Sequence, residues 1–220
     1  MLAWLVSLAV YAAGCVVGLL LRTRLRGLGY RLPEERVLPA RHTWWIVPAT
    51  AFLGLLLWVT VRHTEPVVIA AVFVVAGWAM VALAFIDLDV HRLPDAIQLP
   101  GYPILLLLLV IGATASGDWS ALVRAVIAGV VLFAFYFLLL LLPSGFGFGD
   151  VKLAGLLGML LGWLGWTEVV RATFATFLIG GLVAAALMVS RRTDRRGEFA
   201  YGPSMLAGAV VAIALSAVSG

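Results

Sequence analysis

Long apolar stretches alternate with short polar ones along the whole 220-residue chain. A helix that crosses a bilayer needs roughly 20 mainly apolar residues. The pattern predicts eight such segments, at about residues 1–21, 44–61, 67–86, 101–117, 121–142, 151–166, 169–189 and 203–219. The predicted fold class is therefore all-α, a polytopic membrane helix bundle with about eight transmembrane segments.

The composition agrees with this interpretation. Hydrophobic residues make up 64% of the chain and charged ones 12%, and the mean hydropathy is +1.11, which excludes an ordinary soluble domain. The single cysteine, Cys15, lies inside the first segment. One thiol cannot build a disulfide framework or a cysteine metal site, and we expect neither a metal nor a cofactor.

The sixth segment, 151–166, differs from the others because it is short and carries glycines at 155, 158, 162 and 165. We expect this span to be tilted or only partly embedded. Its glycines fall on one helical face, where they permit a neighbouring helix to pack closely.

Basic residues gather on alternate loops, which predicts the orientation of the chain, since cytoplasmic loops carry an excess of Lys and Arg. One set of loops holds Arg22, Arg24, Arg26, Arg31, Arg36, Arg41, Arg92, Lys152, Arg191, Arg192, Arg195 and Arg196. The opposite set holds only Arg62, Arg124 and Arg171. We place the first set in the cytoplasm and both termini outside. The net charge of +4 then reflects topology and contact with anionic membrane lipid, and no nucleic-acid partner is expected.

Four aspartates stand out from the acidic residues of the loops. Asp87, Asp89 and Asp95 follow the third segment directly, and Asp150 opens the sixth in Gly147-Phe148-Gly149-Asp150. The predicted topology brings both clusters to one membrane face. A carboxylate at the edge of hydrocarbon usually faces a bundle interior or a wet cavity, and so indicates function. The structural alternative is that both clusters simply end their helices in headgroup water.

Two carboxylates that share a site hold one proton between them near neutral pH, because both cannot ionise cheaply. Such a pair can hydrolyse a peptide bond without a metal: one member activates water while the other polarises the carbonyl oxygen. Gly145, Gly147 and Gly149 would let the backbone approach a partner closely. Asp89 would point away from Asp87 on a helix, so at most one of the two lines the site.

These motifs resemble those of the type IV prepilin leader peptidases. The resemblance rests on Gly147-Phe148-Gly149-Asp150 with Val151-Lys152-Leu153, on Asp87 followed by Leu93-Pro94-Asp95, and on Phe199-Ala200-Tyr201-Gly202-Pro203. It covers about residues 67–219 and implies that Asp87 and Asp150 are the catalytic pair. The supporting residues that it implies are Gly147, Gly149, Lys152, Pro94, Asp95, Gly202 and Pro203. From chemistry alone, we expect Asp95 to cap the next helix and Lys152 either to tune Asp150 or to snorkel.

The chain departs from the family in the loop 22–43, which has no cysteine where many members carry a cysteine-rich insert. A thiolate zinc site is therefore excluded there, and we do not expect the N-methyltransferase activity of bifunctional relatives. We divide the chain into an N-terminal two-helix region with a basic cytoplasmic loop, 1–66, and a catalytic membrane bundle, 67–220.

The leading hypothesis is a membrane-embedded aspartic endopeptidase that removes the short basic leader of prepilin or pseudopilin substrates. It would act at the cytoplasmic face of the cell (inner or cytoplasmic) membrane. The alternative is a proton- or cation-coupled secondary transporter that uses the paired aspartates, and a structural assembly subunit is a third reading. The sequence leaves the oligomeric state and the source of the substrate open.

Overall fold

The computed structural model describes residues 2–142, 146–189 and 200–219. Within these ranges the chain forms eight α-helices, one short 3-10 helix and no strand. The helices are α1 (Leu2–Arg26), α2 (Ile46–Val61), α3 (Val67–Val90), α4 (Asp95–Ser116), α5 (Trp119–Leu140), α6 (Phe148–Leu164), α7 (Trp166–Val189) and α8 (Gly202–Ser219), and the 3-10 helix is η1 (Pro33–Val37). Gly145, Phe199 and the arginines predicted between α7 and α8 lie outside the described residues.

Every predicted segment is a helix, which confirms the all-α fold class. Two boundaries differ in a way that matters for the site. Helix α3 runs four residues past the predicted end at 86, so Asp87 and Asp89 belong to its last turn. Helix α4 starts at Asp95 rather than near 101, and Pro100 and Pro103 lie inside it. Proline removes one backbone hydrogen bond, but its φ suits a helix, and membrane helices tolerate it where neighbouring groups satisfy the freed carbonyl.

The protein is a multi-pass membrane protein. Helices α1, α3, α4, α5 and α7 are long and apolar enough to cross a bilayer, and α2 and α8 are shorter apolar helices. Helix α6 has 17 residues, of which 13 are buried. At 1.5 Å per residue it spans about 25 Å, somewhat less than a hydrocarbon core. Most of its residues are therefore enclosed by other helices.

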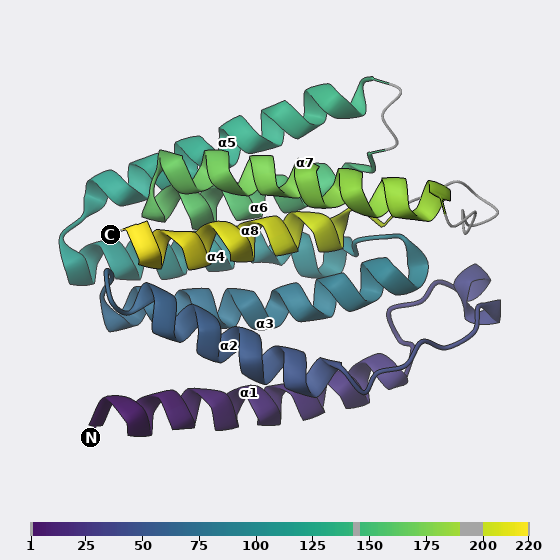
Figure 1. The fold of residues 1–220 in the computed structure, drawn as a ribbon, viewed down its shortest axis with the longest axis horizontal. Helices are drawn as coiled ribbons and strands as arrows, with labels where there is room; N and C mark the ends of the chain where they lie inside the picture. Colours follow the sequence, from purple (N-terminus) through teal and green to yellow (C-terminus); the bar gives the residue numbers. More distant parts are fainter. Residues whose placement is uncertain (1, 143–145, 190–199, 220) are drawn as a thin grey trace.

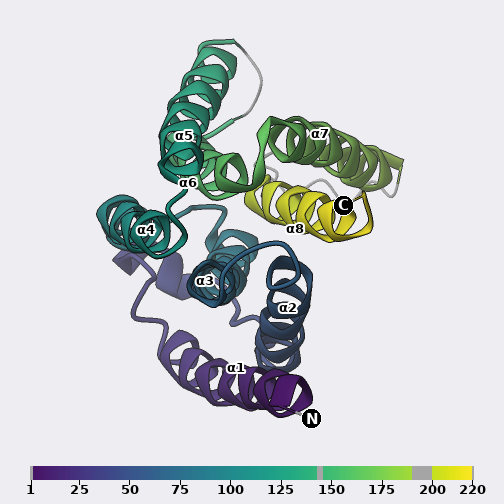
Figure 2. The same ribbon diagram turned by 90° about the vertical axis from the view of Figure 1, so that its left-hand side faces the viewer.

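The helices run roughly along one common direction, with α1 at one edge and α3 and α6 in the interior (Figures 1 and 2). Helix α1 begins and α8 ends at the same end of the bundle (Figure 1). The opposite end gathers the loop between α1 and α2, the turn between α3 and α4, and the starts of α6 and α8 (Figure 1). These are the regions in which the sequence motifs lie.

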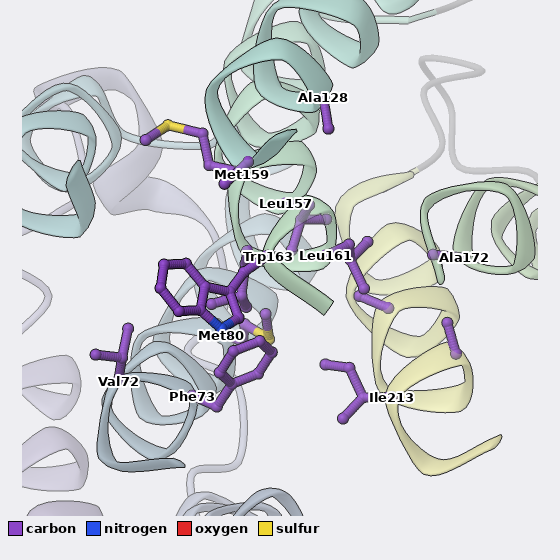
Figure 3. Close-up of a cluster of buried hydrophobic side chains, with 14 of the residues drawn as sticks. Val72, Phe73, Met80, Ala128, Leu157, Met159, Leu161, Trp163, Ala172 and Ile213 are labelled. Carbon is purple, nitrogen blue, oxygen red and sulfur yellow. The ribbon is translucent and has the colours of Figure 1, made fainter. Parts of the chain in front are cut away.

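A continuous apolar core joins α3, α6 and α8. Phe73 and Met80 point toward Leu157, Leu161 and Trp163 of α6, and Ile213 of α8 lies beside them (Figure 3). The core also includes residues of α2. The division of the chain near residue 66 stays a prediction.

Polar side chains fix the C-terminal end of α6. Arg124 of α5 donates to the carbonyl oxygens of Gly162 at 2.8 Å and Trp163 at 2.6 Å. The Trp163 indole N–H donates to Glu65 at 3.0 Å. A cation at a helix C-terminus satisfies orphan carbonyls and complements the helix dipole.

Glycines on one face of α6 allow α5 to approach it closely, as the spacing predicts. A Cβ added at Gly158 would lie 2.6 Å from the carbonyl oxygen of Ala128 and 2.8 Å from the Cα of Gly129. One added at Gly162 would lie 3.0 Å from the Cα of Ala125. Because these obstacles are largely backbone, they cannot move without shifting α5. The close packing of α6 is therefore confirmed for Gly158 and Gly162.

Gly158→Ala should destabilise the folded protein by about 1–3 kcal/mol, the usual cost of forcing a methyl group into a packed interior. The measurement is the midpoint of thermal unfolding in detergent. Gly181→Ala on α7 is the matched control, because a Cβ there would meet nothing within 4 Å. An unchanged midpoint for Gly158→Ala would contradict the α5–α6 packing described above.

Candidate active site

The first predicted aspartate, Asp87, lies in the last turn of α3 and is 4% exposed. Its Oδ2 accepts a hydrogen bond from the backbone N–H of Gly202 at 3.0 Å. Gly202 is the first residue of α8, and Pro203 follows in the first turn, where its missing N–H costs little. The Asp87 motif and the Tyr201-Gly202-Pro203 motif therefore meet directly.

The second aspartate, Asp150, is the third residue of α6 and is 8% exposed. The Gly147 N–H donates to its Oδ2 at 2.9 Å, and the Asp150 N–H donates back to the Gly147 carbonyl at 3.0 Å. The Asp150 side chain thus reaches back to the N-cap N–H, as in one half of a capping box, and this bond holds the carboxylate at the positive end of the helix dipole.

Both aspartates lie beside glycines that approach Leu93. A Cβ added at Gly149 would lie 3.0 Å from the Leu93 Cβ. One added at Gly202 would lie 2.7 Å from Asp87 Oδ2 and 3.5 Å from Leu93 Cδ1. A side chain at either position would therefore press on Leu93 or on Asp87 itself. The two carboxyl groups are close enough to interact electrostatically, and both are buried in protein rather than ending their helices in headgroup water.

Two residues of α4 that were not predicted to belong to the site hold the backbone around Asp150. The Gln98 side-chain amide is fully buried and donates to the Gly149 carbonyl at 2.9 Å. The Tyr102 hydroxyl donates to the Lys152 carbonyl at 2.8 Å. Gln98 and Tyr102 are four positions apart in an otherwise apolar helix, so they share a helical face. That shared face is the feature of the sequence that could have identified them as a pair.

Lys152 and Asp95 join α6 to α4. The Lys152 ammonium pairs with the Asp95 carboxylate and lies 4.8 Å from the centre of the Phe148 ring. The expected capping role of Asp95 is wrong: Pro94 occupies the N-cap position and no side chain caps the helix. Because the extended backbone of Pro94 makes Asp95 the first helical residue, the Asp95 carboxylate is free to reach Lys152.

Asp89 lies on the far side of α3 from Asp87. The Arg31 guanidinium forms an ion pair with it at 2.8 Å, and the Tyr30 hydroxyl donates to it at 2.5 Å. Asp89 thus faces the loop between α1 and α2, as the helical spacing from Asp87 predicts. Arg31 was predicted only to belong to the basic cytoplasmic loop, so its pairing with Asp89 was missed.

A second ion pair links the same loop to the turn after α3. Arg92 donates to Glu35 at 3.0 and 3.1 Å and to the Tyr30 carbonyl at 3.0 Å. The hydrogen bonds from Arg92 hold the pKa of Glu35 below its ordinary value, although partial burial opposes the shift. We call residues 30–39 the arginine cap, since Arg31 and Arg92 fasten them to the end of α3.

The fold and site together define a multi-pass membrane protein with a buried aspartate pair at one end of its bundle. The model of the type IV leader peptidase family matches residues 73–189. The chain belongs to this family. The matched range includes both aspartates and runs from the middle of α3 to the end of α7.

Individual relatives agree with this assignment. A prepilin leader peptidase/N-methyltransferase of Aeromonas hydrophila is 36% identical over 129 residues, 57% of this chain and 43% of the relative. The protein of the same name from Pseudomonas putida is 33% identical over 150 residues, 66% of this chain and 49% of the relative. The chain thus spans just under half the length of these curated relatives. No solved structure matches the chain.

The lowered pKa of Glu35 predicts how the arginine cap responds to acid. A carboxyl group whose folded pKa lies below its unfolded value, about 4.3, stabilises the fold above that value and loses this contribution as the pH falls through the folded pKa. Hydrogen exchange of residues 30–39, corrected for the intrinsic rate, should therefore accelerate below about pH 4. Glu35→Gln should exchange faster at neutral pH and lack the acid-dependent step; an identical acid response in both proteins would refute the role of this pair.

Proposed function

We propose that this chain is an aspartic endopeptidase that removes the short basic leader of prepilin or pseudopilin substrates. The observation that carries the proposal is the burial of Asp87 and Asp150 together, from two different helices, with each carboxylate bound by a glycine N–H. The family assignment supports a peptidase. The printed names of the relatives support a prepilin substrate.

The pair can cleave a peptide bond by general acid–base catalysis. The ionised carboxylate takes a proton from water as the water oxygen bonds to the scissile carbonyl carbon, while the protonated carboxyl donates a hydrogen bond to the carbonyl oxygen. The pair then gives one proton to the leaving nitrogen as the C–N bond breaks. This returns the pair to its starting state, with one shared proton. The chemistry uses water as its only co-reactant.

Helix ends favour different charge states for the two aspartates. Asp150 lies in the first turn of α6, where the positive end of the helix dipole stabilises negative charge. Asp87 lies in the last turn of α3, where the negative end opposes it. We therefore assign Asp150 as the ionised member that activates water and Asp87 as the protonated member that polarises the carbonyl.

The distribution of basic residues supports a cytoplasmic site in the inner membrane. Asp87 and Asp150 lie at the end of the bundle that carries the arginines of the α1–α2 loop (Figure 1). Cytoplasmic loops are the ones enriched in Lys and Arg. A substrate held by its own membrane helix would present the bond just outside that helix at this level. Such anchoring reduces the entropy cost of bringing the bond to the aspartates.

The alternative of a secondary transporter is less well supported. Transporter sites commonly lie near the bilayer midplane between broken helices. Here Asp87 ends α3 and Asp150 begins α6, so both lie at one end of the bundle. The position of the pair therefore favours a reaction at the interface over passage of an ion across the membrane.

Asp87→Asn and Asp150→Asn should each lower the cleavage rate by roughly a thousandfold or more, because the two groups act as one unit. The measurement is conversion of a co-expressed prepilin to its shorter mature form, with membrane insertion of each variant checked by immunoblot. Glu34→Gln is the control, since Glu34 is an exposed carboxylate of η1. Normal processing by either asparagine variant would exclude the proposed mechanism.

We further propose that the chain does not methylate the product, although the names of its relatives include an N-methyltransferase. The only cysteine of the sequence is Cys15, so the loop 22–43 is organised by Arg31 and Arg92 in place of a thiolate zinc site. Mass spectrometry of mature pilin, made in a host with no other such enzyme, should give the unmethylated mass. A product heavier by one methyl group would show that transfer occurs without the cysteine-rich insert.

A further inference from the structure

The end of α3 carries a charge that opposes its own dipole, the carboxylate of Asp89. Asp87 and Asp89 both lie in the last turn, and no basic residue lies in that turn. The final carbonyl groups of a helix bear partial negative charge, so carboxylates there are unfavourable and promote fraying. Asp87 needs this turn to stay helical, because the turn directs its side chain toward Gly202 and Asp150.

The Arg31 side chain supplies the missing positive charge. It is 0% exposed, and the Asp89 side chain with which it pairs is 1% exposed. Its Nε donates to one carboxylate oxygen and its Nη2 to the other, both at 2.8 Å. This two-point geometry fixes orientation as well as charge, and a lysine cannot reproduce it.

The remaining donors of Arg31 bind backbone of the arginine cap. They reach the carbonyl oxygens of Leu38 at 2.7 Å, Pro39 at 3.1 Å and Glu35 at 3.4 Å. One buried guanidinium therefore binds both the backbone of the cap and Asp89 of α3. The arginine cap and the last turn of α3 are in this way a single unit.

Contacts of Tyr30 and Trp45 with α3 strengthen this unit. The Tyr30 hydroxyl donates to Asp89 at 2.5 Å, and its ring meets Phe85 edge-on with centroids 6.3 Å apart. Trp45 contacts the same Phe85 ring at 5.9 Å. Phe85 and Asp89 are four positions apart, so the cap holds one face of the last turn along its length.

Asp87 projects from the opposite side of that turn. Its carboxylate accepts from Gly202 N–H, and its backbone carbonyl accepts from His91 N–H at 2.8 Å, which closes the helix in a left-handed cap. Neither bond reaches the arginine cap. Arg31 can therefore act on Asp87 only through the geometry of the helix that they share.

We infer that Arg31, through Asp89, is a positioning residue that holds the last turn of α3 so that Asp87 meets Asp150. This inference rests on the proposed peptidase function. It also gives a role to the short loop between α1 and α2: the arginine cap stabilises the last turn of α3 on the side opposite Asp87. Misplacement of a catalytic group by about 1 Å can lower a rate by roughly a hundredfold, so a loosened turn has a large effect without any lost contact to substrate.

The test compares Arg31→Ala with Arg36→Ala in the full-length protein. Arg36 is an exposed arginine of the same cap, in η1, and it controls for the loss of one positive charge. Hydrogen exchange of residues 86–91 is measured together with kcat and KM for a purified prepilin. We expect Arg31→Ala to speed exchange in this segment at least tenfold, and to lower kcat about 10- to 100-fold with KM within twofold of the wild type.

Added guanidinium ion provides a rescue experiment. Millimolar guanidinium should restore part of the lost kcat of Arg31→Ala in a saturable way, because the substitution leaves a cavity of matching shape beside Asp89. It should not affect Arg36→Ala. If Arg31→Ala does not fold, Arg31→Lys is held to the same criteria, since it keeps the charge but loses the two-point geometry.

The inference would be overturned by exchange of residues 86–91 that matches Arg36→Ala, or by a kcat within twofold of the wild type despite faster exchange. A reduced folded fraction that accounts for all of the lost activity would also overturn it, because the role would then be stability alone. The exchange measurement needs no substrate. Failure of the wild-type protein to cleave prepilin would therefore count against the proposed function and leave the bracing of α3 separately testable.

Discussion

The structure depends on one constraint, that carboxylates buried at the ends of membrane helices must be given hydrogen-bond donors or opposite charge. Asp87, Asp89 and Asp150 are all buried near one end of the bundle. Each meets the constraint differently. Asp150 is bound by a backbone N–H at a helix start, Asp87 by the N–H of Gly202, and Asp89 by a buried arginine.

These different partners distinguish one structural aspartate, Asp89, from the two proposed catalytic ones. Asp89 accepts two hydrogen bonds from the Arg31 guanidinium and a third from the Tyr30 hydroxyl, so its carboxylate is fully engaged in anchoring the arginine cap. Asp87 and Asp150 each accept only one backbone hydrogen bond among the interactions described. Such partly satisfied carboxyl groups retain lone pairs for water or a substrate carbonyl, which is what general acid–base catalysis requires. Neighbouring aspartates on one helix turn can thus have unrelated roles.

Much of this arrangement could be predicted from the sequence. Apolar runs predicted all eight helices, and alternation of basic loops predicted that Asp87 and Asp150 share one end of the bundle. Glycines at 147, 149 and 202 marked the places where the backbone approaches the site. These features are local in sequence or follow from topology, so a linear pattern carries them.

The missed features are contacts whose partners lie far apart in sequence and whose positions depend on the path of a loop. Arg31 and Asp89 are 58 positions apart, and an arginine that sets topology looks the same in sequence as one that is buried in an ion pair. Gln98 was missed because the predicted segment began at about residue 101, which left Gln98 outside it. The capping role expected of Asp95 failed because the helix starts one residue earlier than a cap at Asp95 would require.

The turn after α3 and the glycine motif at the start of α6 meet at one buried site. Leu93 and Gly149 report on this directly, because a Cβ at Gly149 would lie 3.0 Å from the Leu93 Cβ, close to the separation of about 3.8 Å found in disulfides. The measurement is disulfide formation in a Leu93→Cys/Gly149→Cys variant on a Cys15→Ser background, detected as a cross-linked peptide by mass spectrometry. Leu93→Cys/Gly117→Cys serves as the control, since Gly117 ends α4 at the other end of the bundle. The account predicts ready cross-linking of the first pair and none of the second; a folded Leu93→Cys/Gly149→Cys protein with two free, unlinked thiols after mild oxidation would contradict it.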